Sequence, residues 1–269
     1  MRKLVWFVLS LLVVGSSAFV NVKAEVVFQM KDPAGDDKGA GGLRYPAHDV
    51  FLPGLFDLRE FRVSLDESMI FFDLKFSLVT NPFGAPEGYF HQRMEVYINT
   101  GSSAGLESIL VGGHKLKTPP GLGWQIRILA APFGETRLFL WSPAKVEQIE
   151  KGIKSFLRED GQTIRIAVEK QLLPKPQGAW NYYVLVGAFH GPGLGLWRDV
   201  GDDPLWQLQG EEIPVLDILA PRFGLKSQKR QLRSKILQPV SPRLVRPAFF
   251  LIPLGLGLGF FLWRWIHGA

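Results

Sequence analysis

The sequence predicts an all-β protein built as a two-sheet antiparallel β-sandwich, and three observations carry that prediction. Short segments alternate apolar and polar residues with the period of a half-buried strand. Stretches rich in Gly and Pro, which number 29 and 19 in the 269 residues, separate these segments as turns do. The chain has no cysteine, so an apolar core rather than disulfides must hold the fold.

The predicted strands follow one another through the middle of the chain. Alternation of apolar and polar residues predicts partly buried strands at residues 61–65, 94–98, 126–128 and 164–168. Continuous apolar runs predict two more deeply buried strands, at residues 69–76 and 180–189.

One segment departs from the strand pattern. Ser142 and Pro143 have the residue types of a helix N-cap and a first helical position. Apolar residues follow them at helical spacing, at Val146, Ile149, Ile153 and Phe156. The sequence therefore predicts a short helix over this segment.

The N-terminal residues predict export. Arg2 and Lys3 precede an apolar run at residues 4–14, and small residues follow it up to Ala24. This order is that of a secretory signal peptide, so we expect residues 1–24 to be a signal that is cleaved after Ala24, with cleavage after Ala18 as the second option. An uncleaved anchor is the alternative, although the run is short for a helix that spans a bilayer.

The C-terminal residues predict a membrane anchor. No charged residue occurs between Arg246 and Arg264. A helix over the apolar residues in between would be about 25 Å long, enough to cross a thin bilayer. We expect a transmembrane helix at residues 247–265 and a short tail at residues 266–269. The protein would then be anchored in the cytoplasmic membrane, with its domain on the extracytoplasmic side.

The net charge of +6 is distributed unevenly. Residues 25–217 hold all 25 acidic residues but 19 Lys and Arg, so this region has a net charge of −6. A negative domain excludes nucleic acid as its partner. Eight basic residues and no acidic ones come just after it, at Arg222, Lys226, Lys229, Arg230, Arg233, Lys235, Arg243 and Arg246.

This division of charge sets the expected domain boundaries. We expect one domain at residues 25–220 and a basic juxtamembrane linker at residues 221–246. The linker is either a solvated stalk or a patch that binds anionic lipid or wall polymer.

An acidic, turn-rich motif predicts a calcium site. Asp32, Asp36 and Asp37 lie within six positions that also hold a proline and a glycine. Closely spaced carboxylates can replace the water shell of a hard cation, so we expect these residues and Asp57 to bind Ca²⁺. The spacing is not that of an EF-hand. A solvated turn in which Asp36 or Asp37 binds its own backbone is the alternative.

No pattern in the sequence identifies an active site. The chain has no nucleophile elbow and no glycine-rich loop with phosphate-binding spacing. The histidines lie apart, without the spacing of zinc ligands, at His48, His91, His114, His190 and His267. Acidic pairs occur, but a glycosidase pair has no signature of its own in one sequence, so glycoside hydrolysis stays a lower-ranked alternative.

A series of collinear motifs resembles a known family. The longest motifs lie at residues 32–39, 51–58, 81–88, 180–186 and 215–221, and shorter ones include Tyr45 with Pro46, and Trp206. They resemble the C-terminal module of glucodextranase, a domain related to DOMON domains and to family 9 carbohydrate-binding modules. The resemblance implies a β-sandwich that binds carbohydrate or the cell surface and carries out no chemistry. Asn99 stands where the family tends to have Asp, which removes one charge.

Two tryptophans are the expected ligand contacts. Trp197 ends a glycine-rich loop that begins at Gly191, and Trp124 follows Gly121 and Gly123. Loops of this composition are usually exposed, so we expect one or both rings to stack on a sugar. The alternative is that these rings close the end of the sandwich.

The sequence thus predicts a non-catalytic, membrane-anchored extracytoplasmic module that binds carbohydrate or attaches to the cell envelope. The competing class is a structural subunit that recognises another envelope protein. A haem-binding module is a lower-ranked alternative, because DOMON relatives include such modules. Its nearest candidate ligands, His91 and Met94, would face opposite sides of a strand.

Overall fold

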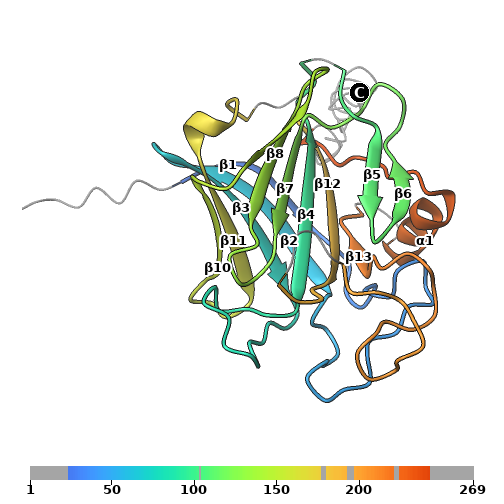
Figure 1. Cartoon of the computed structure of the whole chain (residues 1–269). Coiled ribbons are helices and arrows are strands. Elements are labelled where there is room, and N and C mark those ends of the chain that lie inside the picture. The colour runs from blue at the N-terminus through green and yellow to red at the C-terminus, as the bar shows by residue number, and fades with distance from the viewer. Residues whose placement is uncertain (1–23, 103, 177–179, 193–196, 221–223, 243–269) are drawn as a thin grey trace, which may run out of the picture.

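Two antiparallel sheets form the body of the computed structural model, which describes residues 24–102, 104–176, 180–192, 197–220 and 224–242 (Figure 1). The first sheet contains, in spatial order, β1 (Glu25–Lys31), β2 (Leu58–Leu65), β3 (Met69–Phe76), β11 (Thr163–Glu169) and β10 (Ile153–Leu157). The second contains β13 (Asp217–Ile218), β12 (Asn181–Ala188), β4 (Gln92–Asn99), β7 (Ile126–Ala130), β8 (Arg137–Trp141) and β9 (Val146–Ile149). The predicted all-β, sandwich-like fold is confirmed.

Three smaller elements complete the described chain. A separate hairpin consists of β5 (Ser108–Val111) and β6 (His114–Lys117). A short 3₁₀ helix, η1 (Lys170–Leu172), follows β11, and one α-helix, α1 (Gly224–Ser234), lies near the C-terminal end.

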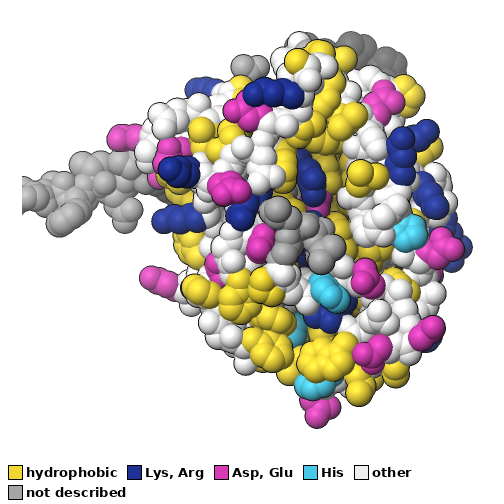
Figure 2. Space-filling view, viewed as in Figure 1, with side chains coloured by type: hydrophobic (Ala, Val, Ile, Leu, Met, Phe, Trp, Pro, Cys, Tyr) yellow, Lys and Arg dark blue, Asp and Glu magenta, His cyan; other side chains and the backbone are white. Residues whose placement is uncertain are grey.

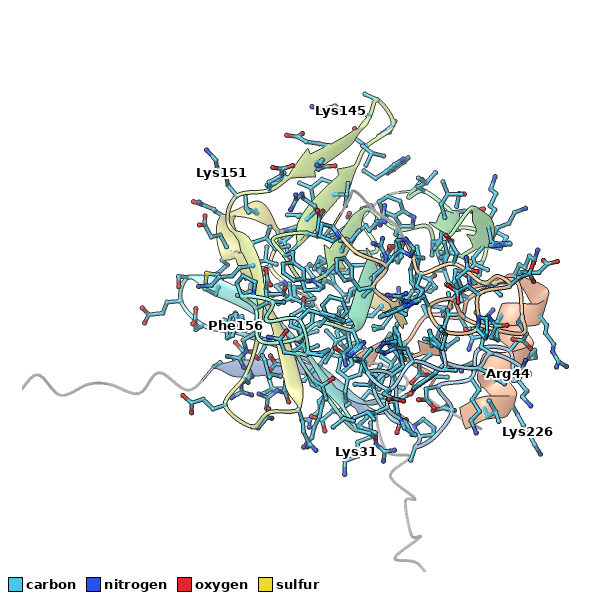
Figure 3. All side chains as sticks on the ribbon, turned by 60° about the horizontal axis from the view of Figure 1, so that its bottom comes forward. Lys31, Arg44, Lys145, Lys151, Phe156 and Lys226 are labelled. Carbon is cyan, nitrogen blue, oxygen red and sulfur yellow. The ribbon has the colours of Figure 1, made fainter. Side chains whose placement is uncertain are left out.

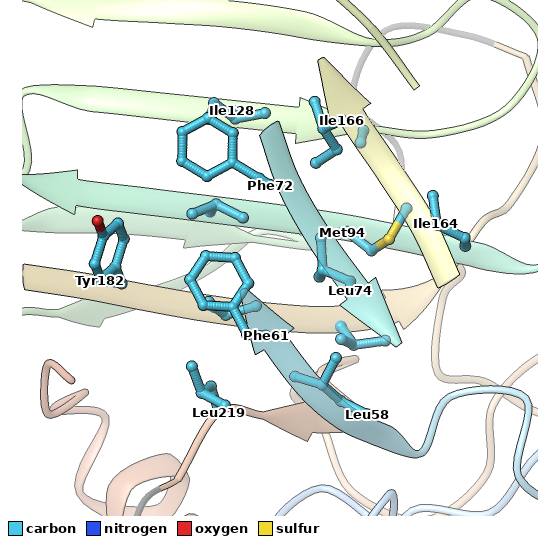
Figure 4. Close-up of a cluster of buried hydrophobic side chains, with 14 of the residues drawn as sticks. Leu58, Phe61, Phe72, Leu74, Met94, Ile128, Ile164, Ile166, Tyr182 and Leu219 are labelled. Atoms are coloured by element: carbon cyan, nitrogen blue, oxygen red, sulfur yellow. The ribbon is translucent and has the colours of Figure 1, made fainter. Parts of the chain in front are cut away.

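The main core lies between the two sheets. Alternate residues of each strand point inward, as the period of a strand requires. The rings of Phe61 on β2 and Tyr182 on β12 have their centroids 5.5 Å apart. Figure 4 shows Phe72 of β3, Met94 of β4 and Ile166 of β11 in the same cluster, and all three are fully buried. This packing stabilises the sandwich without any disulfide.

The outer face of the second sheet is covered as well. The hairpin β5–β6 and helix α1 lie beside that sheet in Figure 1. Val111 of the hairpin and Leu232 of the helix join a second apolar cluster with Tyr97 of β4 and Leu185 of β12. Strand β4 is therefore buried along its whole length, charged residues included.

The helix expected after Ser142 is wrong. The apolar residues at helical spacing belong to two strands, β9 in the second sheet and β10 in the first. Between them Gly152 has φ +75°, a conformation that interrupts a helix and turns the chain from one sheet to the other. The regular spacing therefore arose by chance across a change of sheet.

The described part of the basic segment is not a solvated stalk. Within it, helix α1 packs on the domain and buries Gln228 and Leu232. Further on, the backbone of Val240 exchanges hydrogen bonds of 2.8 and 2.9 Å with Tyr182. The domain therefore continues well past the expected boundary at Ala220. The side chains of Lys226, Arg230, Arg233 and Lys235 are exposed, and Figure 3 shows Lys226 pointing away from the domain.

The predicted signal peptide and transmembrane helix fall almost wholly outside the described residues. Residues 1–23 and 243–269 carry them, apart from Ala24 at the start of the described chain. Within the described part, no helix is both long and apolar enough to cross a bilayer.

Candidate functional site

An open groove of about 890 Å³ lies between the loops that carry the two N-terminal motifs. Residues 35–45 of the first loop and residues 51–57 of the second contribute most of its lining, and Ser77 completes it. The glycines and prolines of both loops turn the chain back on itself, so side chains from each reach the same space. Two motifs that are separate in the sequence thus form one concave surface.

The groove combines an aromatic ring with polar groups. Tyr45 is half-buried, and its ring lies edge-on to Phe56 at a centroid distance of 4.9 Å. Its hydroxyl donates a hydrogen bond to the Asp37 carboxylate and accepts one of 3.3 Å from the Phe56 N–H. Burial and the Asp37 charge raise the pKa of Tyr45, so the phenol stays protonated. Lys38 and Arg44 add cationic side chains to the lining.

An exposed tryptophan lies near this groove. Trp206 is 38% exposed, and its ring lies 4.2 Å from the ring of His48. Phe51, which lines the groove, lies 6.1 Å from Trp206 in an edge-on arrangement. A ligand that lies in the groove beside Phe51 could therefore extend to the exposed ring of Trp206.

Three buried carboxylates form a separate cluster that does not line the groove. Asp32, Asp36 and Asp217 each have a carboxylate oxygen within 4.8 Å of the other two. Asp32 follows β1, Asp36 lies in the next loop, and Asp217 begins β13 in the other sheet. The structure thus brings together two of the four predicted calcium ligands and adds one from the far end of the domain.

The other two predicted ligands have different partners. Asp37 lies at the groove and binds Tyr45. Asp57 accepts hydrogen bonds from the Gly35 N–H at 2.9 Å and from the Ser77 hydroxyl at 2.5 Å. The Arg59 guanidinium also lies 3.4 Å from Asp57. Neither residue belongs to the three-carboxylate cluster.

Burial changes the acidity of the cluster. Desolvation raises the pKa of Asp32 to about 9 and that of Asp36 to about 6. Desolvation also raises the pKa of Asp217, and the neighbouring Asp32 and Asp36 charges raise it further. The three carboxylates therefore cannot all carry a charge at low cost unless a positive group joins them.

The expected exposure of two tryptophans is wrong. Trp197 and Trp124 are only 3% and 4% exposed. Gly187 leaves a slot in β12 that the Trp197 ring fills, and the Arg93 guanidinium lies 5.0 Å above that ring. Trp124 donates its indole N–H to the Ser108 carbonyl at 3.0 Å. Both rings therefore pack in the apolar cluster on the outer face of the second sheet.

The nearest haem-ligand candidates are both buried. His91 is surrounded by the rings of Phe51, Phe56 and Phe90, and Met94 lies in the main core. Burial lowers the pKa of His91 to about 4, with a further contribution from the Arg198 charge. This arrangement gives the haem alternative no support.

The sequence reasoning missed three residues of this region: Tyr45, Trp206 and Asp217. All three residues lie in motifs that carry the family resemblance, but the motifs alone assigned no role to them. The partners of Asp217 lie more than 180 positions away, where spacing carries no information.

The chain matches a known family. The model of a C-terminal, SLH-like binding module of glucodextranase matches residues 27–242. The matched range includes the groove, the acidic cluster and helix α1. No curated protein matches the chain.

Proposed function

The chain belongs to the family of C-terminal, SLH-like binding modules of glucodextranase, and from this membership we propose that it is a non-catalytic module that binds carbohydrate. The ligand site in this proposal is the groove between residues 35–45 and residues 51–57. The observation that carries it is the combination of the half-buried Tyr45 ring with carboxylate and cationic groups on one concave surface, with the exposed Trp206 ring beside Phe51 of that surface.

The chemistry of the groove suits a sugar. A pyranose ring presents CH groups on one face, and these pack favourably against an aromatic ring such as that of Tyr45 or Trp206. Its hydroxyl groups at the ring edge can donate to the Asp37 carboxylate and accept from Lys38 or Arg44. A few polar groups in an otherwise apolar groove would fix the orientation of the sugar.

The test is a binding measurement on the full-length chain in mild detergent. We would measure retention on immobilised glucodextran and on cell-wall polysaccharide. The Trp206→Ala variant should weaken binding about tenfold, which corresponds to about 1.4 kcal/mol. Phe133→Ala is the matched control, because Phe133 is 37% exposed but contacts Phe90 rather than Phe51, the groove residue that Trp206 contacts.

Equal binding by the wild type and Trp206→Ala would exclude Trp206 from the site. Equal losses of polysaccharide binding in both variants would show that the binding surface lies outside the groove. Release of sugar ends from either polysaccharide by the wild type would contradict the non-catalytic part of the proposal and favour the hydrolase alternative.

A second candidate function is recognition of another envelope protein. Phe83 and Phe133 are 49% and 37% exposed, and both contact Phe90, at centroid distances of 4.5 and 6.1 Å. Apolar side chains gather at the lower end of the molecule in Figure 2. Exposed apolar patches of this kind are typical of protein contacts. Loss of a cross-linked envelope partner in Phe83→Ser, with glycan binding unchanged, would support this candidate.

We also propose that the protein is exported and anchored in the cytoplasmic membrane, as the patterns at residues 1–24 and 247–265 predict. External protease should then remove the domain from intact spheroplasts. A domain that stays protected until lysis would contradict this placement.

The exposed basic side chains of α1 give the proposed anchor a second membrane contact. Lys226, Arg230 and Arg233 are exposed on this helix. If they bind anionic lipid or wall polymer, the full-length protein without its signal should bind anionic vesicles less tightly as salt is added, because exposed charges are screened. Binding that does not change with salt would exclude this contact.

A further inference from the structure

We propose that Asp32, Asp36 and Asp217 bind one Ca²⁺ ion, which fastens the end of β1 in one sheet to the start of β13 in the other. This goes beyond carbohydrate binding, since the cluster is buried and none of the three residues lines the groove. It also differs from the set of ligands that the sequence predicts, because Asp37 and Asp57 are replaced by Asp217.

The unpaired oxygens of the cluster are the first argument. Asp36 is 2% exposed, and neither of its carboxylate oxygens has a hydrogen-bond partner among the described residues. The same holds for one oxygen of Asp32 and one of Asp217. Buried carboxylate oxygens in proteins almost always have a partner. Four unpaired oxygens in one cluster therefore indicate a positively charged ligand.

The orientation of two carboxylates is already fixed. Oδ1 of Asp32 accepts a hydrogen bond of 2.9 Å from the Ala220 N–H. Oδ2 of Asp217 accepts one of 2.9 Å from the Leu58 N–H. In each residue the other oxygen remains for the cluster. The ligand oxygens are therefore held by the backbone before any ion binds.

The charge of the cluster is the second argument. Three carboxylates within 4.8 Å of one another would carry three negative charges in a space that is almost closed to water. The nearby Arg59 is paired with Asp57 rather than with the cluster. Uncompensated buried charges cost several kcal/mol each. Either protons or a cation must neutralise them.

The donor set favours calcium over other metals. All three donors are carboxylate oxygens, and the chain has no cysteine to offer sulfur. Oxygen donors suit hard cations, whereas zinc and copper prefer imidazole and thiolate. Magnesium usually keeps several of its waters, while calcium accepts a site made mostly of protein oxygens. A buried cluster of carboxylates therefore fits Ca²⁺ best.

Helix α1 holds the two sides of the site together. The Gln228 side-chain amide donates hydrogen bonds to the carbonyl oxygens of Asp36 and of Gly39, the latter at 3.1 Å. Its carbonyl oxygen accepts the Ile218 N–H at 2.9 Å. One buried side chain thus fixes the loop that carries Asp36 against the strand that carries Asp217.

The test is the melting temperature of the full-length protein in detergent after dialysis against chelator. Adding Ca²⁺ in tenfold steps above the Kd should raise the Tm by about 3 to 6 °C for each step. Equilibrium dialysis should show one Ca²⁺ bound per chain. The Asp36→Asn variant should fold but lose the response, because it removes a charge and no side-chain hydrogen bond.

The matched control is Asp37→Asn, which alters a neighbouring buried carboxylate outside the cluster and should keep the response. If Asp36→Asn does not fold, Asp217→Asn replaces it, since its amide oxygen can still accept the Leu58 N–H. A wild-type Tm that is unchanged by Ca²⁺, with no bound ion, would overturn the proposal in favour of protonated carboxyl groups. An Asp36→Asn variant that keeps the full response would overturn it as well.

Discussion

The carboxylate of Asp217 accepts a hydrogen bond of 2.9 Å from the backbone N–H of Leu58. Asp217 begins β13 at the edge of the second sheet, and Leu58 begins β2 in the first. The bond therefore joins the two layers at one edge of the sandwich, where the apolar core ends. A second hydrogen bond, from the Ala220 N–H to the Asp32 carboxylate, joins the same two layers.

Glu95 should be the most sensitive charged residue on the outer face of the second sheet. It is fully buried and binds the guanidinium groups of Arg93 at 2.6 Å and Arg127 at 3.0 Å. Glu95→Gln should lower the free energy of unfolding by about 3 to 5 kcal/mol, because the buried Arg93 and the half-buried Arg127 lose their counter-ion. Urea titration measures this loss.

Glu147 provides the control for that measurement. It forms an exposed ion pair with Lys145 at 3.2 Å. Glu147→Gln should change the free energy of unfolding by less than about 1 kcal/mol. Similar losses in the two variants would contradict a structural role for the buried pairs.

Gly187 should not tolerate a side chain. A Cβ at this position would lie 2.2 Å from the Trp197 ring and 2.8 Å from the Pro214 carbonyl oxygen. Gly187→Ala should therefore cost more than about 3 kcal/mol, beyond the usual range for overpacking, since backbone as well as ring must move.

Comparison with Gly161→Ala distinguishes the cost of a steric clash from the cost of backbone strain. Gly161 has φ +67°, and a Cβ added there would meet nothing within 4 Å, so its substitution should cost only about 1 to 2 kcal/mol. Thermal unfolding of both variants gives the comparison. A milder effect at Gly187 than at Gly161 would show that Trp197 is not held in its slot.

His91 should make the protein less stable in mild acid. Burial lowers its pKa to about 4 in the folded state, whereas the unfolded chain has the ordinary value of about 6.5. The unfolded state therefore takes up the proton first. The stability contribution of neutral His91 is complete above pH 6.5 and is lost as the pH falls toward 4, by up to about 3 kcal/mol.

The difference between two pH profiles isolates this effect. His91→Phe should fit among the surrounding rings of Phe51 and Phe90 and should remove the part of the pH dependence between 6.5 and 4 that His91 causes. The carboxylates that titrate in the same range contribute equally to both proteins and cancel. Parallel profiles for the variant and the wild type would refute the assignment.

Gln228 should contribute far more to stability than its neighbours on α1. Gln228→Ala would leave the Asp36 carbonyl oxygen and the Ile218 N–H without their side-chain partner. An unsatisfied buried polar group costs about 1 to 3 kcal/mol, so the total loss should reach at least about 2 kcal/mol. Arg230→Ala, on the exposed face of the same helix, should stay within about 0.5 kcal/mol in urea titration.

The strands were the most predictable part of the fold. The alternation of apolar and polar residues at 61–65 and 164–168 indicates which side chains face the core. Both segments are strands in the structure. The helix expected after Ser142 failed because spacing alone does not reveal a change of sheet at Gly152. Helix α1 was missed because its sequence is rich in charge, and its buried face depends on Gln228 and Leu232.

The candidate sites were predictable only in part. The clustering of Asp32 and Asp36 is local, so it was visible in the sequence, whereas Asp217 joins them only through the pairing of β13 with β12. Trp197 was expected to be exposed because its loop is rich in glycine. The decisive residue for its burial is Gly187, on a strand ten positions earlier, and no local pattern shows that relation.

The hydrogen bonds between Val240 and Tyr182 limit how far the domain can stand from a bilayer. If residues 247–265 span a membrane, only residues 243–246 separate the last described residue from the lipid, a reach of about 14 Å even when fully extended. A free segment starting at residue 221 would have a reach of about 90 Å. The domain would then be held close to the lipid surface and could not move far from it. Its ligands would be those within a few nanometres of the membrane.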